Sequence, residues 1–266
     1  MAAIDKYNQR VEKVNSLVCV GLDSDFDKIP ERFKSLEFPQ FEFNKYIIEA
    51  THPYVSAYKP NLAFYEARGD QGIKELKMTM DYLHERYPDI YTVADAKRAD
   101  IGSTNEGYVK FIFDWLGFDA VTLNPYLGGE ALKPFLDRKD KGSIILCRTS
   151  NPGSGEFQDL AVYGQPLWQL VGEKVRNDWN ANNNCMLVVG ANHPGELSGL
   201  RALMGEMTFL VPGVGSQGAE VESAVKAGLN LRKVGMIINS SRAIIFAQRP
   251  QDEAQKLKDE INKYRS

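Results

Sequence analysis

The sequence predicts an α/β fold, a (β/α)8 TIM barrel in which residues 1–266 form a single domain. Eight short apolar segments, typical of buried parallel strands, alternate with amphipathic helical segments along the chain. The strand-like segments end in polar or charged residues, as expected where such barrels carry their chemistry. Because no linker or shift in composition divides the chain, one domain is expected.

The eight predicted strands are short runs rich in apolar and β-branched residues. They cover residues 16–22, 54–61, 91–95, 119–124, 142–149, 185–191, 207–211 and 235–239. Helices are predicted where apolar residues recur every three or four positions. They cover residues 4–14, 41–50, 72–86, 103–117, 166–177, 194–204, 219–227 and 251–264. The first helix is expected to plug or flank one end of the barrel, and residues 153–164 form a glycine-containing loop.

The same alternation also permits a doubly wound open sheet. A dinucleotide-binding sheet would carry a glycine-rich fingerprint after its first strand, and this sequence has none there. Its clearest glycine-rich turn, residues 213–218, follows the seventh predicted strand, and Arg242 follows the eighth. Since barrels commonly bind phosphate at those two places, the barrel is favoured.

Composition excludes several classes of partner. With 43% hydrophobic and 25% charged residues and a net charge of -3, the chain is an ordinary globular protein without the basic character of a nucleic-acid binder. No apolar run approaches the roughly 20 residues of a membrane span, and the N-terminal segment lacks an apolar signal core. We therefore expect a cytoplasmic protein with no nucleic-acid or membrane partner.

The cysteines and histidines give no sign of a metal centre. Cys19, Cys147 and Cys185 lie in separate apolar runs, so we expect buried thiols rather than a disulfide framework. None of the three histidines stands at metal-ligand spacing from another histidine or a cysteine. A histidine-based metal site and a serine-type triad are therefore not expected.

The most informative stretch is residues 91–104, where a β-strand pattern gives way to Asp95, Lys97 and Asp100. Residues two apart on a strand share a face, so Asp95 and Lys97 point to the same side. Ser103, with a glutamate three residues later, predicts a helix N-cap, which places Asp100 in the connection between strand and helix. An isolated D-x-K-x-x-D string is more often a solvated loop, but at the end of a barrel strand it indicates catalysis.

Other strand ends should meet this charged turn. Asp23 follows the first strand and Lys59 stands at the end of the second, so two lysines and two or three carboxylates alternate around one mouth. Such neighbours hold lysines in the protonated form and orient their charge in advance. On the far side, backbone N–H groups of residues 213–218 and the guanidinium of Arg242 predict a phosphate site.

Together these motifs resemble orotidine 5′-monophosphate decarboxylase, in order over nearly the whole chain. The longer loops resemble the branch of that family found in many bacteria and some protozoan parasites. The sequence departs from the commoner pattern at Ser241, where the family usually has glycine before the arginine. The matching segments are Gly21-Leu22-Asp23, Lys59-Pro60-Asn61, Asp95–Thr104, Thr149–Gly153, Pro212–Gly218 and Ser241-Arg242.

The resemblance implies cofactor-free conversion of orotidine 5′-monophosphate to uridine 5′-monophosphate (UMP) and CO2, the last step of de novo pyrimidine synthesis. It implies that Asp95 crowds the substrate carboxylate, that Lys97 stabilises and then protonates the C6 carbanion, and that Lys59 orients the network and the ribose. A fixed cation suits this reaction because the carbanion has no π-system to delocalise into.

The resemblance also implies a set of substrate-binding residues at the strand ends. Asp23 and Asn61 would bind ribose hydroxyls, Ser150 would read the pyrimidine edge, and Gln217 and Arg242 would hold the phosphate. The full set is Asp23, Asn61, Ile101, Thr104, Ser150, Pro212, Gln217, Ser241 and Arg242.

A homodimer with shared active sites is the last implication. Asp100 would come from the partner subunit, and Ile101 and Thr104 beside it would enter the partner's site. The geometry agrees, because Asp100 lies beyond the strand on a turn that heads toward the outer helices.

Two other functions are compatible with a barrel of this kind. One is a sugar-phosphate lyase or aldolase that uses a divalent metal held by acidic strand ends. It is disfavoured because the second strand ends in Lys59 rather than a carboxylate. The other is a catalytically silent barrel for binding or assembly, which leaves the alternation of lysines and carboxylates unexplained.

Overall fold

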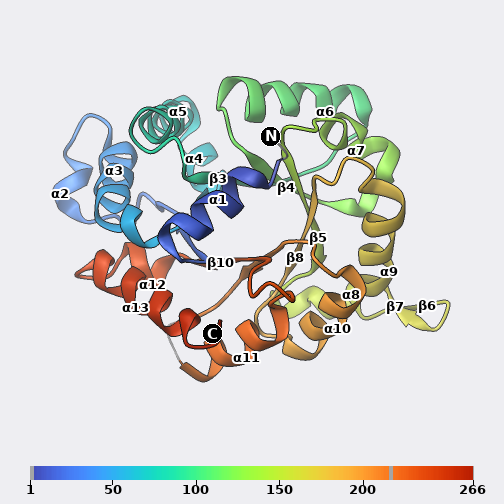
Figure 1. Ribbon diagram of the computed structural model, residues 1–266. Coiled ribbons are helices and arrows are strands. Elements are labelled where there is room, and N and C mark those ends of the chain that lie inside the picture. The colour runs from blue at the N-terminus through green and yellow to red at the C-terminus, as the bar shows by residue number, and fades with distance from the viewer. Residues whose placement is uncertain (1–2, 216–217, 266) are drawn as a thin grey trace.

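The computed structural model describes residues 3–215 and 218–265. Its centre is a closed barrel of eight parallel strands in the order β1-β10-β9-β8-β5-β4-β3-β2, with helices around the outside (Figure 1). This confirms the predicted (β/α)8 fold. The open doubly wound sheet is excluded because β1 pairs with both β2 and β10 and so closes the ring.

All eight predicted strands are present, with ends that differ from the predictions by a few residues. The third strand continues to Arg98, beyond the predicted end at Asp95. The strands are β1 Val18–Leu22, β2 Ala57–Pro60, β3 Tyr91–Arg98, β4 Ala120–Leu123, β5 Gly142–Arg148, β8 Cys185–Val189, β9 Phe209–Pro212 and β10 Met236–Ser240.

The predicted helices are also present. Two of them end in π-helical turns, η2 Lys110–Trp115 and η5 Val175–Trp179. The α-helices are α1 Asp5–Val14, α3 Pro39–Thr51, α5 Gly69–Arg86, α6 Gly102–Val109, α9 Leu167–Lys174, α10 Pro194–Met204, α11 Gly218–Gly228 and α13 Pro250–Asn262.

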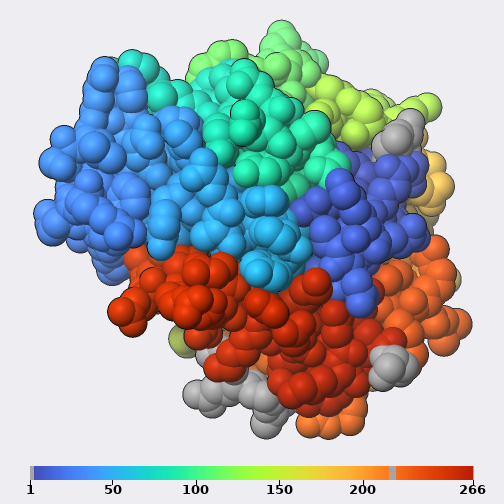
Figure 2. Space-filling model, turned by 60° about the vertical axis from the view of Figure 1, so that its left-hand side comes forward, coloured from blue at the N-terminus to red at the C-terminus, as the bar shows by residue number. Residues whose placement is uncertain are grey.

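The first helix covers the amino-terminal end of the barrel, as predicted. Lys6 pairs with Asp119, just before β4, at 2.7 Å, and the Tyr7 hydroxyl donates to the carbonyl of Met236 at the start of β10. The C-terminal helix reaches the end of this helix, because the Asn262 amide donates to the carbonyl of Asn15 at 2.9 Å. The space-filling view shows the first helices (blue) against the C-terminal helices (red) (Figure 2).

Several short helices were not predicted. The longest of them, α7, contains Pro134 and begins with two glycines, residues that argue against a helix in a sequence. Packing stabilises it nevertheless, since Leu132 and Phe135 on its inner face are fully buried. The unpredicted helices are α2 Glu31–Lys34, η1 His52–Tyr54, α4 Ala63–Glu66, η3 Pro125–Leu127, α7 Gly128–Leu136, η4 Pro152–Ser154, α8 Gly155–Gln158 and α12 Arg242–Ile245.

Two local predictions are wrong. Ser103 is not the N-cap of α6: the helix begins one residue earlier, and its cap position, Ile101, makes no side-chain hydrogen bond. The segment 153–164 is not simply a loop, since it contains α8 and one strand of the hairpin β6 Ala161–Val162 and β7 Gln165–Pro166. The three cysteines are buried free thiols, as expected.

Candidate active site

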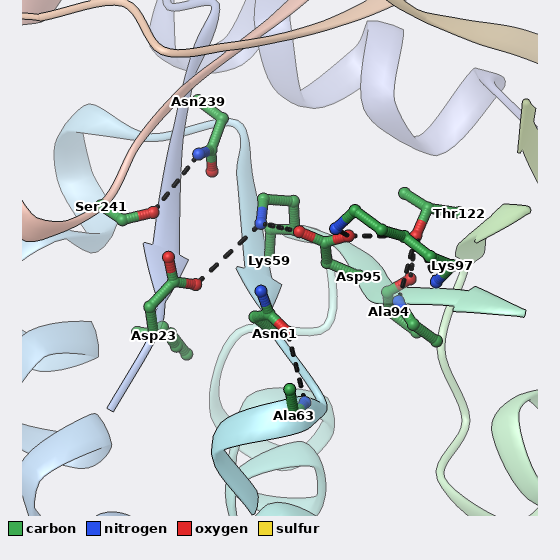
Figure 3. A network of polar contacts seen from close by, with 12 residues as sticks. Asp23, Lys59, Asn61, Ala63, Ala94, Asp95, Lys97, Thr122, Asn239 and Ser241 are labelled. Carbon is green, nitrogen blue, oxygen red and sulfur yellow. Dashed lines mark hydrogen bonds and ion pairs between the residues drawn. The ribbon is translucent and has the colours of Figure 1, made fainter. Parts of the chain in front are cut away.

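Three charged side chains meet at the carboxyl ends of β2 and β3. Lys59 donates to Asp95 Oδ2 at 2.6 Å, and Lys97 donates to Asp95 Oδ1 at 2.6 Å, so one carboxylate is shared by two ammonium groups. Lys59 is 4% exposed and Asp95 11%, whereas Lys97 is 50% exposed. Figure 3 shows Asp95 between the two lysines. The predicted network therefore exists, with Lys97 as its member most open to a ligand.

The network keeps both buried members charged. Burial alone would lower the pKa of Lys59, but the charges of Asp95 and Asp23 outweigh it and hold that pKa above its ordinary value of 10.5. Burial alone would raise the pKa of Asp95, but Lys59 and Lys97 outweigh it and hold that pKa well below 3.8. At neutral pH the site thus presents a carboxylate and a buried ammonium ion.

Asp23 and Asn61 complete the near side of the mouth. Gly21 in β1 lies opposite Lys59 in β2. This pairing places Asp23, two residues after Gly21, near that lysine. The distance from Lys59 Nζ to Asp23 Oδ1 is 4.0 Å, and this oxygen is buried without a hydrogen-bond partner in the described structure. The backbone of Asn61 pairs with that of Asp95 in an isolated β-bridge, and the side-chain Oδ1 of Asn61 accepts the N–H of Ala63 at 3.2 Å. Asp23 therefore places a second carboxylate beside the charged network.

The turn after β3 presents its side chains to the outside. Asn105 holds this turn: its side chain accepts the N–H of Asp100 at 3.0 Å and donates to the carbonyl of Asp100 at 2.6 Å. The carboxylate of Asp100 accepts the N–H of Ile101 at 2.7 Å and, within the described residues, pairs with no lysine or arginine. Ile101 is 63% exposed, and Thr104 is exposed. The structure does not bring these residues to Lys97 of the same chain.

The far side of the mouth carries Ser150, Pro212, Ser241 and Arg242. Ser150 is exposed and lies close to Gly213, where a Cβ would come within 3.9 Å of its hydroxyl. Pro212 ends β9 and is half-buried, and Arg242 is exposed at the first turn of α12. Gln217, predicted to hold phosphate, lies outside the described residues.

Ser241 and Gly21 approach each other closely at the ends of two neighbouring strands, β10 and β1. A Cβ at Gly21 would lie 1.9 Å from Ser241 Oγ and 2.9 Å from Ser241 Cβ, so glycine is required at this position. Asn239 in β10 donates to Ser241 Oγ at 3.3 Å, and its own Oδ1 is buried without a partner in the described chain. The hydroxyl of Ser241 is thus held by a side chain of β10, the strand before it.

Sequence reasoning missed two buried polar residues of this site, Asn239 and Thr122. Thr122 in β4 lies 3.1 Å from Asp95 through its hydroxyl oxygen. Both residues lie inside predicted strands, where their side chains have no special pattern. A polar residue near the carboxyl end of a barrel strand is the only signal that could have identified them.

Comparison with known proteins agrees with this geometry. The family model described as "Orotidine 5'-phosphate decarboxylase / HUMPS family" matches residues 16–257. A relative from Cellvibrio japonicus, named orotidine 5′-phosphate decarboxylase, is 46% identical over 257 residues, which cover 96% of this chain and 93% of the relative. A relative of the same name from Christiangramia forsetii is 48% identical over 239 residues, covering 90% of this chain and 87% of the relative.

Solved structures show the same likeness. The structure of Leishmania donovani OMP decarboxylase superposes with a TM-score of 0.89 at 37% sequence identity, covering 100% of this chain and 99% of that chain. A structure from Toxoplasma gondii described as a putative orotidine-monophosphate-decarboxylase gives 0.88 at 35% identity, covering 98% and 96% of the two chains. The match in sequence and in fold shows that this chain belongs to the orotidine 5′-phosphate decarboxylase / HUMPS family.

Proposed function

We propose that Lys59, Asp95 and Lys97 carry out the reaction of this chain, the conversion of orotidine 5′-monophosphate to UMP and CO2 in pyrimidine biosynthesis. The observation that carries this assignment is the shared carboxylate: Asp95 accepts from both lysines at 2.6 Å. The site places a fixed negative charge and an accessible positive charge next to each other, which this reaction uses in different steps.

In the proposed reaction, the bond between C6 and the substrate carboxylate breaks and its electron pair stays on C6. The ammonium of Lys97 stabilises this carbanion and then transfers a proton to it. Asp95 disfavours the bound substrate carboxylate by like-charge repulsion, which ends when neutral CO2 forms. Lys59, almost fully buried, holds Asp95 in the ionised form and in place.

We propose for the other residues the substrate-binding roles that the family resemblance implies, and their positions at the strand ends support these roles. The carboxylate of Asp23, whose side chain is 19% exposed, accepts from a ribose hydroxyl, and Asn61 contacts the same sugar. Ser150 reads the pyrimidine edge from the far side of the mouth. The phosphate is bound by Arg242, an exposed guanidinium, together with Pro212, Gln217 and Ser241. Binding energy from this remote phosphate contributes to catalysis at C6.

A homodimer with shared active sites is part of the proposal. Large apolar side chains are exposed at the amino-terminal ends of α6 and α7, two helices that pack side by side: Ile101 is 63% exposed, Tyr126 87% and Leu127 48%. Exposed apolar side chains of this size, gathered on one rim, are typical of an interface. Asp100 lies on the same rim, so a symmetric contact would bring it to the partner's Lys97.

We also propose a cytoplasmic location. The three buried cysteines are free thiols, which suits a reducing compartment. Burial raises the pKa of the Cys19 thiol to about 12, so this thiol stays protonated beside the charged network.

The activity is tested by following the ultraviolet absorbance of orotidine 5′-monophosphate with purified protein, with and without a chelator. The proposal expects complete conversion to UMP at the same rate in both samples. Lys97→Ala should lose this activity, and Lys110→Ala, which removes an exposed lysine from η2, should keep it. Turnover that stops with chelator would favour the metal-dependent lyase, and an active Lys97→Ala variant would refute the role of Lys97.

The shared site is tested by mixing Lys97→Ala and Asp100→Ala proteins, each nearly inactive alone. After subunit exchange, one site of a mixed dimer carries both substitutions and the other carries neither. Since half of the dimers in a random mixture are mixed, activity should recover to about a quarter of wild type. No recovery despite demonstrated exchange would mean that Asp100 acts within its own chain.

A further inference from the structure

The hydroxyl of Thr122 connects Asp95 and Lys97 of the charged network. Thr122 is a residue of β4 and is 1% exposed. Its Oγ1 accepts the backbone N–H of Ala96 at 3.0 Å and that of Lys97 at 2.9 Å, and lies 3.1 Å from Asp95 Oδ1. Figure 3 shows Thr122 beside Lys97 and Asp95. One buried oxygen therefore touches both residues that are proposed to act on the substrate.

The donors and acceptors of this hydroxyl are fully determined. A threonine hydroxyl has one hydrogen and two lone pairs, and the two backbone N–H groups occupy both lone pairs. Its hydrogen then has two possible acceptors, Asp95 Oδ1 at 3.1 Å and the carbonyl of Ala94 at 3.5 Å. The shorter distance and the negative charge both favour Asp95. Thr122 thus donates to the carboxylate while it accepts from the backbone of Lys97.

The backbone at Lys97 needs such support. Its φ is +47°, in the left-handed region that L-residues other than glycine rarely adopt, and the β3–β4 register shifts between Ala94 and Arg98. In a regular parallel sheet, the N–H groups of two successive residues point to opposite sides of the strand, so residues 96 and 97 would donate to main-chain carbonyls of two different neighbouring strands. Across this bulge, the side chain of Thr122 accepts from both instead. Because the direction of the Lys97 side chain follows from this backbone conformation, Thr122 determines where the ammonium points.

We propose that Thr122 is a positioning residue for decarboxylation, whose hydroxyl holds the left-handed turn at Lys97 and the orientation of Asp95. The inference rests on the roles proposed for Asp95 and Lys97. Thr122→Val, which keeps the shape but loses the hydroxyl, would leave the buried N–H of Ala96 and the partly buried N–H of Lys97 without their acceptor and let the turn relax. Thr122→Ser keeps the hydroxyl and should therefore keep the function.

The test measures kcat and KM for orotidine 5′-monophosphate. For Thr122→Val we expect kcat to fall about tenfold or more, with KM changing less than about threefold, since the lost contact acts on the chemical step. Thr122→Ser should restore kcat to within about threefold of wild type. The matched control is Thr92→Val: Thr92 is also 1% exposed, and its hydroxyl donates to Asp119 at 2.9 Å at the opposite end of the barrel. This control should leave kcat unchanged.

Several results would overturn the inference: wild-type kcat in Thr122→Val, equal losses in the serine and valine variants, or a raised KM at unchanged kcat. If Thr122→Val does not fold, Thr122→Cys replaces it, because a thiol of similar size is only a weak acceptor. These results differ from those expected if the proposed function itself is wrong. In that case the wild-type protein would be inactive, or Lys97→Ala would be active.

Discussion

Replacing Asp95 with asparagine removes the one charge that two lysines share. Lys59 would stay 4% exposed, with Asp23 as its nearest carboxylate at 4.0 Å, and Lys97 would lose its 2.6 Å contact. Removing one partner of a buried ion pair costs about 3–5 kcal/mol because the other charge remains buried. Since Asp23 still gives Lys59 partial compensation, we expect a loss of about 3 kcal/mol in the free energy of unfolding.

The pH dependence of this loss has a definite sign. The folded-state pKa of Asp95 lies below its ordinary value of 3.8, so its stabilisation is present above pH 3.8 and is lost as the pH falls through the folded-state pKa. The pKa of Lys59 lies above 10.5, so its contribution is present below pH 10.5 and is lost at higher pH. The difference between wild type and Asp95→Asn should therefore be constant between these limits and shrink below pH 3.8.

The assay is urea unfolding, monitored by circular dichroism at neutral pH and below pH 3.8. It compares the wild type, Asp95→Asn, Lys59→Met and the double variant in a double-mutant cycle. The double variant should be more stable than Asp95→Asn alone, because it no longer buries an uncompensated ammonium. Asp137→Asn, which breaks an exposed pair with Lys133, is the control and should cost less than about 1 kcal/mol. Additive losses in the cycle, or a loss as small as that of the control, would refute the coupling of Asp95 to Lys59.

Two further predictions concern the phosphate side of the site. Arg242→Ala should raise KM for orotidine 5′-monophosphate about tenfold or more, through loss of a charge-assisted contact, and should affect the nucleoside orotidine far less; equal losses for both would show that Arg242 does not hold the phosphate. Gly21→Ala should destabilise the protein, as its Cβ would lie 1.9 Å from Ser241 Oγ, and the double variant with Ser241→Gly should recover most of the stability measured by thermal unfolding. No recovery would place the strain elsewhere.

The barrel could be predicted from the sequence because its strands are buried on both faces. Buried parallel strands appear as short apolar runs, and all eight were found on that basis. The helix α7 was missed for the opposite reason: Pro134 and its opening glycines disfavour a helix locally, and only the packing of its inner face, which depends on the whole fold, stabilises it.

The charged residues of the site could also be predicted, but not what holds them in place. Asp95 and Lys97 follow a recognisable strand, so their convergence with Lys59 follows from the barrel alone. The left-handed turn at Lys97 and its contact with Thr122 could not be foreseen, because a threonine in a strand is ordinary and its partners lie more than twenty residues earlier. The N-cap assigned to Ser103 was wrong because Asn105 organises the turn instead.

In the proposed mechanism, Lys97 delivers the proton to C6. The same step run backwards removes the C6 proton of the product, so the enzyme should exchange that proton of UMP for deuterium in D2O, as followed by NMR. We predict exchange by the wild-type protein and none above background by Lys97→Ala, even at saturating UMP, while Lys110→Ala exchanges normally. Exchange by Lys97→Ala at the wild-type rate would contradict the claim and assign the proton transfer to another group.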